Sequence, residues 1–207
     1  MTNIIFDFDN TLIDAGAFRR ELKQAVVGAG LAPTAFEGIY YRLGRHPSGF
    51  GPDEFFREAE SLFSTPVAEA AAREAFFKVV DGVRRYNDRH AEDVLERLSK
   101  QGHKLVLLSR GHEGWQRLKL ARSGLSPYFS SVIISPGNKI HYLEEAAGPG
   151  YSIFINDDYS ETLAMSSAAP LHDYLIMAGF RSPPLDCEFP TCFDLDEVAN
   201  LIDAMLN

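Results

Sequence analysis

The chain has 207 residues, 45% of them hydrophobic and 24% charged, and this ordinary globular composition at this length favours one core domain with an inserted or appended module. Its formal net charge of −9 argues against the basic surface that a nucleic-acid partner requires. No apolar run approaches the roughly 18 residues of a membrane-spanning helix, so we expect a soluble protein with no membrane partner.

The first predicted element is a buried strand over residues 3–6, which leads directly into Asp7-Phe8-Asp9-Asn10-Thr11. A short apolar strand followed at once by acids is typical of a strand whose carboxyl end opens into a site. We therefore take Asp7 and Asp9 as functional candidates, with simple turn or helix capping as the alternative. The residues before Asp7 contain no basic region, and Asp7 interrupts the apolar run, so we expect no secretory signal and a cytoplasmic location.

Helical periodicity fills the segment from about residue 15 to residue 86. Apolar residues recur every three to four positions there, and glycines and prolines mark the connections. We expect a loop to begin near Pro33 and a glycine- and proline-rich connection to span residues 44–51. The expected helices run from Phe18 to Ala29, from Phe36 to Leu43, from Pro52 to Leu62, and from Pro66, with Thr65 as N-cap, to Val83.

After Tyr86 the pattern alternates between helices and strands, which is typical of a parallel sheet with helices on both faces. The helical segment separates the first strand from the later ones, so we interpret it as an insertion into an α/β domain. The expected elements are strands at 105–108, 132–134, 152–155 and 174–177, helices with the apolar stripes Val94-Leu95-Leu98, Trp115-Leu118-Ala121 and Tyr142-Leu143-Ala146, and a final helix with Asp194 as N-cap and Glu197 three residues on.

The cysteine content excludes two classes of protein. Cys187 and Cys192 are the only cysteines, too few for a disulfide framework and without the grouping of a four-ligand zinc site. We expect both to be reduced and structural.

Polar residues follow three further predicted strands, and the carboxyl ends of parallel strands meet at one edge of a sheet. Clustered carboxylates hold a hard divalent cation, while a lysine and a hydroxyl bind phosphate oxygens. The sequence therefore predicts a magnesium-assisted phosphoryl-transfer site at this edge. Its residues, besides Asp7 and Asp9, are Ser109 and Arg110 after the second strand, Lys139 after the third, and Asp157, Asp158 and Glu161 after the fourth.

Each of these residues also has a plainer interpretation. Ser109 could cap a strand end, and Lys139 could be a solvated surface lysine. Arg110 could contact the substrate or point to solvent. The acids at 157, 158 and 161 could form only the first turn of a helix, where the helix dipole favours negative charge.

In these motifs the chain is similar to the haloacid dehalogenase-like hydrolases, and within them to the phosphatases that carry a helical cap after the first strand. The resemblance covers nearly the whole chain. It implies a Rossmann-like core of residues 1–14 and 87–207 with an all-helical cap at 15–86. The four motifs of the family are matched, in order, by Asp7-x-Asp9-x-Thr11, by Leu107-Leu108-Ser109, by Lys139, and by Asp157 with either Asp158 or Glu161.

The resemblance also implies a role for each residue. Asp7 would be the nucleophile that forms an aspartyl-phosphate, and Asp9 would act as general acid and base. Thr11 would brace the loop within a phosphate-binding set completed by Ser109, Arg110 and Lys139. Mg²⁺ would be held by the side chain of Asp7, the backbone carbonyl of Asp9 and the side chain of Asp157, with Asp158 or Glu161 in support.

Three positions depart from the usual motifs of the family. Asn156 stands where glycine is usual, Glu161 where aspartate is usual, and Arg110 where asparagine is common. In the expected cap, Arg42, Arg45 and His46 could contact the leaving group of the substrate, although loop arginines are usually solvated.

The function predicted from this resemblance is a Mg²⁺-dependent phosphatase acting on a small phosphorylated metabolite. A phosphomutase and a phosphate-sensing protein without turnover are the alternatives. A hydrolase of carbon–chlorine bonds is disfavoured by Asp9, because the dehalogenases of this family lack the second acid and a halide leaving group needs no proton. Physiological substrate and oligomeric state are open at this stage.

Overall fold

The computed structural model of the chain describes residues 2–47, 49–148, 150–168 and 174–206. In these residues six strands form one parallel sheet in the order β3-β2-β1-β4-β5-β6. The predicted α/β fold with a Rossmann-like parallel sheet is therefore confirmed. The strands are β1 (Asn3–Phe6), β2 (Lys104–Arg110), β3 (Ser131–Ser135), β4 (Ser152–Asn156), β5 (Tyr174–Ala178) and β6 (Thr191–Cys192).

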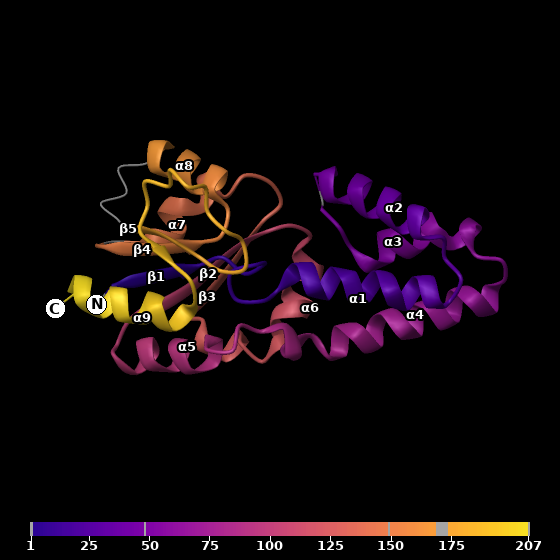
Figure 1. Cartoon of the computed structure of the whole chain (residues 1–207), viewed down its shortest axis with the longest axis horizontal. Coiled ribbons are helices and arrows are strands. Elements are labelled where there is room, and N and C mark those ends of the chain that lie inside the picture. The colour runs from indigo at the N-terminus through magenta and orange to yellow at the C-terminus, as the bar shows by residue number, and fades with distance from the viewer. Residues whose placement is uncertain (1, 48, 149, 169–173, 207) are drawn as a thin grey trace.

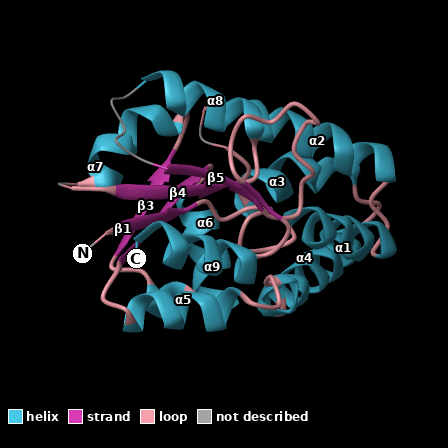
Figure 2. Cartoon of the chain, turned by 60° about the vertical axis from the view of Figure 1, so that its left-hand side comes forward, coloured by secondary structure: helices cyan, strands magenta, loops and turns pink. Residues whose placement is uncertain are grey.

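Helices cover both faces of this sheet (Figures 1 and 2). Successive residues of a strand point to opposite faces, so Ile4 and Phe6 of β1 pack on one side and Ile5 on the other. Strands buried on both faces explain the continuous apolar runs of the sequence. The covering helices are α5 (Ala91–Lys100), α6 (Glu113–Ser123) and α9 (Leu195–Leu206) on the first face, and α7 (Leu143–Ala147) and α8 (Tyr159–Ala168) on the second.

The strand order places the start of the chain in the middle of the sheet. Ile5 of β1 lies opposite Val106 of β2 and Phe154 of β4. The order of connections reverses between β1 and β4, and ligands of such sheets bind at that point, beyond the carboxyl ends of the strands. Asp7, the residue that follows β1, therefore lies at the position where a ligand site is expected.

Helices fill residues 15–86, as predicted, and lie beyond the carboxyl edge of the sheet (Figure 1). Asp14 caps the first of them through a hydrogen bond from the Ala17 amide at 2.7 Å, and the predicted cap Thr65 accepts one from Ala68 at 3.1 Å. The division of the chain into separate core and cap domains stays a prediction. The helices are α1 (Ala15–Gly28), α2 (Pro33–Arg45), α3 (Pro52–Ala59) and α4 (Pro66–Asp81), with short 3₁₀ turns at Glu60–Leu62 and Val83–Tyr86.

An aromatic cluster joins this helical segment to the rest of the protein. Trp115 of α6 stacks on Phe18 of α1, with ring centroids 5.9 Å apart, and lies 5.8 Å from both Phe50 and Phe76. Buried aromatic pairs at this spacing stabilise a packing arrangement beyond the burial of their surface. Helix α6 is thereby fixed between the sheet and α1.

Two details differ from the prediction. The loop expected to begin near Pro33 ends there, because Pro33 is the first residue of α2, where its missing N–H costs no hydrogen bond. Strand β6 was not predicted, since two residues are too few to show alternation. Cys187 and Cys192 are unpaired, as expected. No helix in the described ranges is long and apolar enough to cross a bilayer.

Candidate active site

The loop that follows β1 is tightly constrained. The Asp7 amide continues the sheet by donating to the Ile155 carbonyl at 3.0 Å, and Asn10 adopts a left-handed conformation with φ of +62°. The carbonyl of Asn10 accepts a hydrogen bond at 2.7 Å from the Phe180 amide, in the loop after β5. This loop therefore has backbone contacts with the ends of both β4 and β5.

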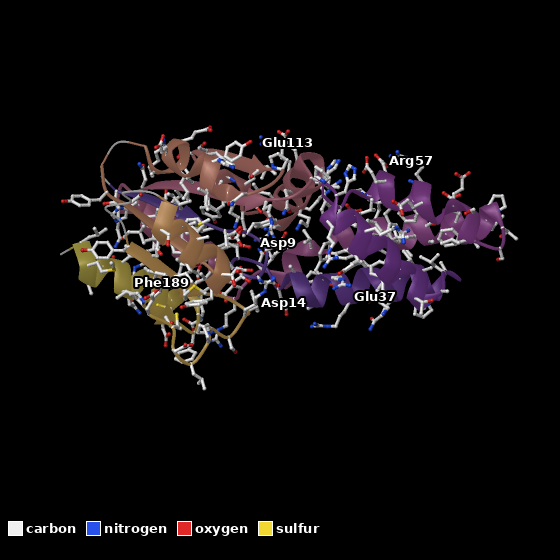
Figure 3. All side chains as sticks on the ribbon, turned by 90° about the horizontal axis from the view of Figure 1, so that it is seen from above. Asp9, Asp14, Glu37, Arg57, Glu113 and Phe189 are labelled. Atoms are coloured by element: carbon white, nitrogen blue, oxygen red, sulfur yellow. The ribbon has the colours of Figure 1, made fainter. Side chains whose placement is uncertain are left out.

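A cavity of about 460 Å³ opens at this loop, between the strand ends and helices α1 and α2. Figure 3 shows Asp9 at the junction between the α/β part of the molecule and the helical segment. Of the predicted site residues only Thr11 does not line the cavity, and its buried hydroxyl has no hydrogen-bond partner in the described ranges. The predicted residues that line it are Asp7, Asp9, Ser109, Arg110, Lys139, Asp157, Asp158 and Glu161.

Lys139 is the most deeply buried cation of the site. Its Nζ lies 2.6 Å from Oδ1 of Asp7 and 2.8 Å from Oε2 of Glu161. Burial works to lower the pKa of Lys139, but the charges of Asp7 and Glu161 outweigh it and leave that pKa raised. Lys139 is therefore a fixed positive charge beside Asp7, and Glu161 is held in this ion pair.

Asp7 and Asp157 are two buried acids that disfavour each other's charge. Burial raises the pKa of Asp7, although Lys139 opposes the shift. Burial, followed by the charge of Asp7, raises the pKa of Asp157 to about 7 against the effect of Arg181. Two such acids side by side call for a further positive charge when both are ionised.

The donor set at these acids fits a Mg²⁺ ion. Oδ2 of Asp157 is buried and receives no well-directed hydrogen bond within the described residues, although Nε of Arg181 lies 3.0 Å away. Among those residues no three acid, histidine or cysteine side chains gather to hold a metal by themselves. Mg²⁺ in phosphoryl-transfer sites commonly has one or two carboxylates plus water and substrate oxygens, which Asp7, Asp157 and the carbonyl of Asp9 can complete.

Asp9 is held by two residues that the sequence analysis did not predict. Lys119 forms an ion pair with Oδ1 of Asp9, and Nε2 of Gln116 donates to Oδ2 at 2.8 Å. Gln116 Nε2 also lies 3.2 Å from the Ser109 hydroxyl and 2.7 Å from the Arg110 carbonyl. Both oxygens of Asp9 are thus engaged by helix α6.

The buried face of α6 explains why these residues were missed. The predicted apolar stripe Trp115-Leu118-Ala121 was wrong in part, because Ala121 is exposed whereas the polar residues Gln116 and Lys119 are buried together with Trp115. Trp115 and Lys119 are four positions apart and share one face of a helix. The sequence signal that could have identified Lys119 as a buried residue is its position four residues after Trp115, the single tryptophan of the sequence.

Two further groups contact the acids that follow β4. Arg181, in the loop after β5, places Nη1 2.9 Å from Oδ2 of Asp158 in addition to its contact with Asp157. Asp158 also accepts a hydrogen bond from the Glu161 amide at 3.0 Å, as an N-cap of α8 does. Asp158 therefore has the helix-capping role that the sequence left open. Arg110 is exposed, and its Nη1 lies 4.0 Å from Oε1 of Glu161.

A family model described as haloacid dehalogenase-like hydrolase matches residues 1–149, which include the acids after β1, Ser109 and Lys139. The chain belongs to the haloacid dehalogenase-like hydrolases. No curated protein sequence gives a significant match.

Solved structures share the fold of this hydrolase over almost their whole length. A protein of Burkholderia xenovorans described as a haloacid dehalogenase-like hydrolase has a TM-score of 0.77 and 18% identity, with 99% of this chain and 98% of that chain covered. A 2-haloacid dehalogenase of Pseudomonas syringae has a TM-score of 0.67 and 16% identity, with 99% of both chains covered. A protein of Thermotoga maritima described as a beta-phosphoglucomutase has a TM-score of 0.65 and 18% identity, again with 99% of both chains covered. Identities this low establish the fold and not the reaction.

The cap residues considered from the sequence do not line the cavity of this hydrolase. Arg42 pairs with Glu58 at 2.6 Å, and the Arg45 guanidinium lies 3.9 Å from the ring centroid of Tyr41. Neither these arginines nor His46 is among the described residues around the cavity. The helical segment contributes Ala15, Gly16, Phe18, Arg19 and Leu22 of α1 and Tyr40 of α2 instead.

Proposed function

We propose that this hydrolase is a Mg²⁺-dependent phosphatase that cleaves a small phosphorylated metabolite through an aspartyl-phosphate on Asp7. The observation that carries the proposal is the second acid, Asp9, which lines the same cavity as Asp7 and is held there by α6. An alcohol leaving group needs a proton, whereas a halide does not. A residue fixed in this way beside the nucleophile favours phosphate-ester cleavage over dehalogenation.

The first step forms the covalent intermediate. A carboxylate oxygen of Asp7 attacks phosphorus, and the bond between phosphorus and the alcohol oxygen breaks. Lys139 offsets the negative charge of Asp7 and of the phosphate. The Ser109 hydroxyl accepts a hydrogen bond from Gln116 at 3.2 Å, so its own proton is free for a phosphate oxygen.

Asp9 carries the proton through both steps. In its protonated form it gives the proton to the departing alcohol oxygen, and as a carboxylate it then takes one from the water that attacks phosphorus. The P–O bond to Asp7 breaks in this second step, which releases phosphate and restores the Asp7 carboxylate. Asp9 ends the cycle protonated, as it began.

The metal requirement follows from the acids at the end of the sheet. The side chains of Asp7 and Asp157 and the backbone carbonyl of Asp9 would hold Mg²⁺, whose charge would offset the repulsion between an attacking carboxylate and an anionic phosphate. Helices α1 and α2 lie on the opposite side of the cavity and limit the access of water to it.

A panel of phosphate monoesters, assayed for released phosphate with and without Mg²⁺, tests the proposal. We expect Mg²⁺-dependent release by the wild type and none by a folded Asp7→Asn variant. Chloride release from a 2-haloacid would instead establish a dehalogenase. Transfer of phosphate within a sugar phosphate, without release, would establish a phosphomutase. Binding of metal and phosphate with no turnover would leave a sensing protein.

A further inference from the structure

We propose that the alcohol released from the substrate carries a second anionic group, a carboxylate or a phosphate, which is bound by Lys119, Arg19 and Tyr40. The inference rests on the proposed phosphatase reaction, because that reaction places the departing alcohol beside Asp9. All three residues line the same cavity as Asp9. They come from helices α6, α1 and α2, on the side away from the strand ends.

Lys119 is a buried cation with unused hydrogen-bonding capacity. Its side chain is 4% exposed, and its Nζ lies 5.3 Å from the ring centroid of Phe8 and 5.8 Å from that of Trp115. An ammonium has three N–H donors, and Asp9 is its only hydrogen-bond partner in the described part of the chain. A lysine that is removed from water in this way gains from a further anion in the cavity.

Arg19 faces the cavity from α1 and belongs to a cluster with excess positive charge. Its guanidinium lies 4.2 Å from the ring centroid of Tyr40 and pairs with Glu37, which Lys23 also contacts at 2.8 Å. One carboxylate thus serves two cations. The hydrogen bond from Lys23, together with Arg19, holds the pKa of Glu37 below its usual range. Glu37 therefore stays charged, and the cluster keeps a net positive charge beside the cavity.

Tyr40 adds a neutral donor between these two cations. Its hydroxyl has no hydrogen-bond partner among the described residues, yet the residue lines the cavity. Burial, followed by the negative charge of Asp9, raises the pKa of Tyr40 to about 12. The hydroxyl keeps its proton at neutral pH and can donate it to an oxygen of the ligand.

The acids in the cavity are segregated to the strand side, where Lys139 and Arg181 pair with them, and this gives the substrate an orientation. Apart from Asp9, the acids of the lining follow β1 and β4 on the strand side, where the phosphate under attack and Mg²⁺ would bind. The helix side contributes the cations Lys119 and Arg19 and no other acid among the described residues. A cavity of about 460 Å³ suits a short carbon chain between two anionic groups. Phe18, Leu22 and Trp115 supply the apolar surface for that chain.

Matched pairs of esters test the inference on the wild-type protein. Ethyl phosphate is compared with phosphoglycolate, which adds a carboxylate, and propane-1,3-diol monophosphate is compared with the bisphosphate, which adds a phosphate. We expect a kcat/KM at least 10-fold higher for the member of one pair that carries the second anionic group, because a charged hydrogen bond to a desolvated cation contributes that much. The pair that shows the larger ratio identifies which anion is bound.

Variants assign the effect to the three residues. Arg19→Gln and Lys119→Met should each lower the ratio of kcat/KM, ester with the second anionic group over ester without it, by about 10- to 100-fold, and Tyr40→Phe by about 3- to 10-fold. Arg20→Gln is the matched control, because Arg20 is the next residue of α1, is exposed and does not line this cavity. If Lys119→Met does not fold, the variants of Arg19 and Tyr40 decide the question.

Equal kcat/KM for both members of both pairs, or an unchanged ratio in Arg19→Gln and Tyr40→Phe, would overturn the inference while leaving a phosphatase. Failure of the proposed function looks different. If no ester is turned over, calorimetric binding to the Asp7→Asn protein still compares the pairs. Selective binding of the member with the second anionic group would then support the inference without the reaction, and absence of selective binding would overturn the inference as well as the proposed function.

Discussion

The two sides of the cavity hold their charges in different ways. On the strand side, Asp7 and the acids that follow β4 are paired with Lys139 or Arg181 from the chain itself. On the helix side, Lys119 has a single carboxylate partner and the Tyr40 hydroxyl has no hydrogen-bond partner among the described residues. The strand side is therefore assembled in advance for chemistry on phosphate. The helix side keeps spare donors for a ligand.

This difference has a structural cause. Residues at strand ends are placed by the register of a sheet that is buried on both faces, so their positions leave little freedom. Lys119 and Arg19 reach the cavity from helices, where side-chain length and rotation about the helix axis decide what a residue contacts. The helix side can change its selectivity without disturbing the sheet.

The largest effect is expected from Lys139→Met on the strand side. It leaves Asp7 and Glu161 without their shared cation, and loss of one partner from a buried ion pair costs about 3–5 kcal/mol of folding free energy. Lys100→Met is the control, because Lys100 pairs with Glu96 at 2.7 Å but is 72% exposed, and it should cost less than about 1 kcal/mol. Urea unfolding of both variants measures the difference, and equal costs would contradict a preassembled strand side.

Gly179→Ala tests how the loop after β5 is held against the nucleophile loop. A Cβ at Gly179 would lie 2.1 Å from the Asn10 carbonyl oxygen, and the residue has φ of +127°, so we expect a loss of about 2–4 kcal/mol. Gly102→Ala shares a positive φ, +85°, but meets nothing within 4 Å and should cost about 1 kcal/mol. Thermal or urea unfolding compares them, and similar losses would show that the close approach is unimportant.

Gln116→Met probes the group between the two sides. The amide of Gln116 bonds Asp9, the Ser109 hydroxyl and the Arg110 carbonyl, so its loss should misplace the general acid. We expect kcat to fall about 10- to 100-fold with little change in KM. Gln101→Met, which removes a bond to Asp203 at 2.9 Å on the surface, should leave kcat unchanged. A rise in KM alone would indicate a role in ground-state binding instead.

Arg181→Gln should give the smallest effect, on the affinity for Mg²⁺. Arg181 is half-exposed and contacts Asp157, so its removal frees an oxygen that we assign to the metal and should tighten Mg²⁺ binding about 5-fold. Calorimetric titration of the protein with Mg²⁺ alone measures this, with Arg117→Gln, which pairs with Glu113 at 3.0 Å, as the control. Weaker binding by Arg181→Gln would mean that the arginine supports the site rather than competing for it.

Most residues on the strand side of the cavity could be predicted from the sequence, whereas those on the helix side could not. Asp7, Ser109, Lys139 and Asp157 were found because they follow apolar strands in the order and spacing of the family motifs. The fold was read from the alternation of helices and strands, which periodicity records well. The sequence could not show that Asp158 accepts a hydrogen bond from a helix amide while Glu161 pairs with Lys139, because either acid could cap the helix or face the site.

The residues on the helices could not be placed in the same way. Arg19 and Lys23 lie four positions apart on one helix, and both contact Glu37, but only Arg19 lines the cavity. That distinction depends on how α1 packs against α4 and α6, which is a tertiary property. Arg181 lies beyond a strand end in a loop whose path depends on the contact of Gly179 with Asn10.

The central claim is that Asp7 becomes phosphorylated and that Asp9 is needed to complete the cycle. Intact-protein mass spectrometry of the Asp9→Asn variant, mixed with Mg²⁺ and 4-nitrophenyl phosphate, tests this directly, because the nitrophenolate of this ester leaves without a proton and only the second step then needs Asp9. We expect a protein heavier by one phosphoryl group, with the modification mapped to Asp7 and absent from Asp7→Asn. An unmodified Asp7, in a preparation whose wild type releases phosphate from the same ester, would contradict it.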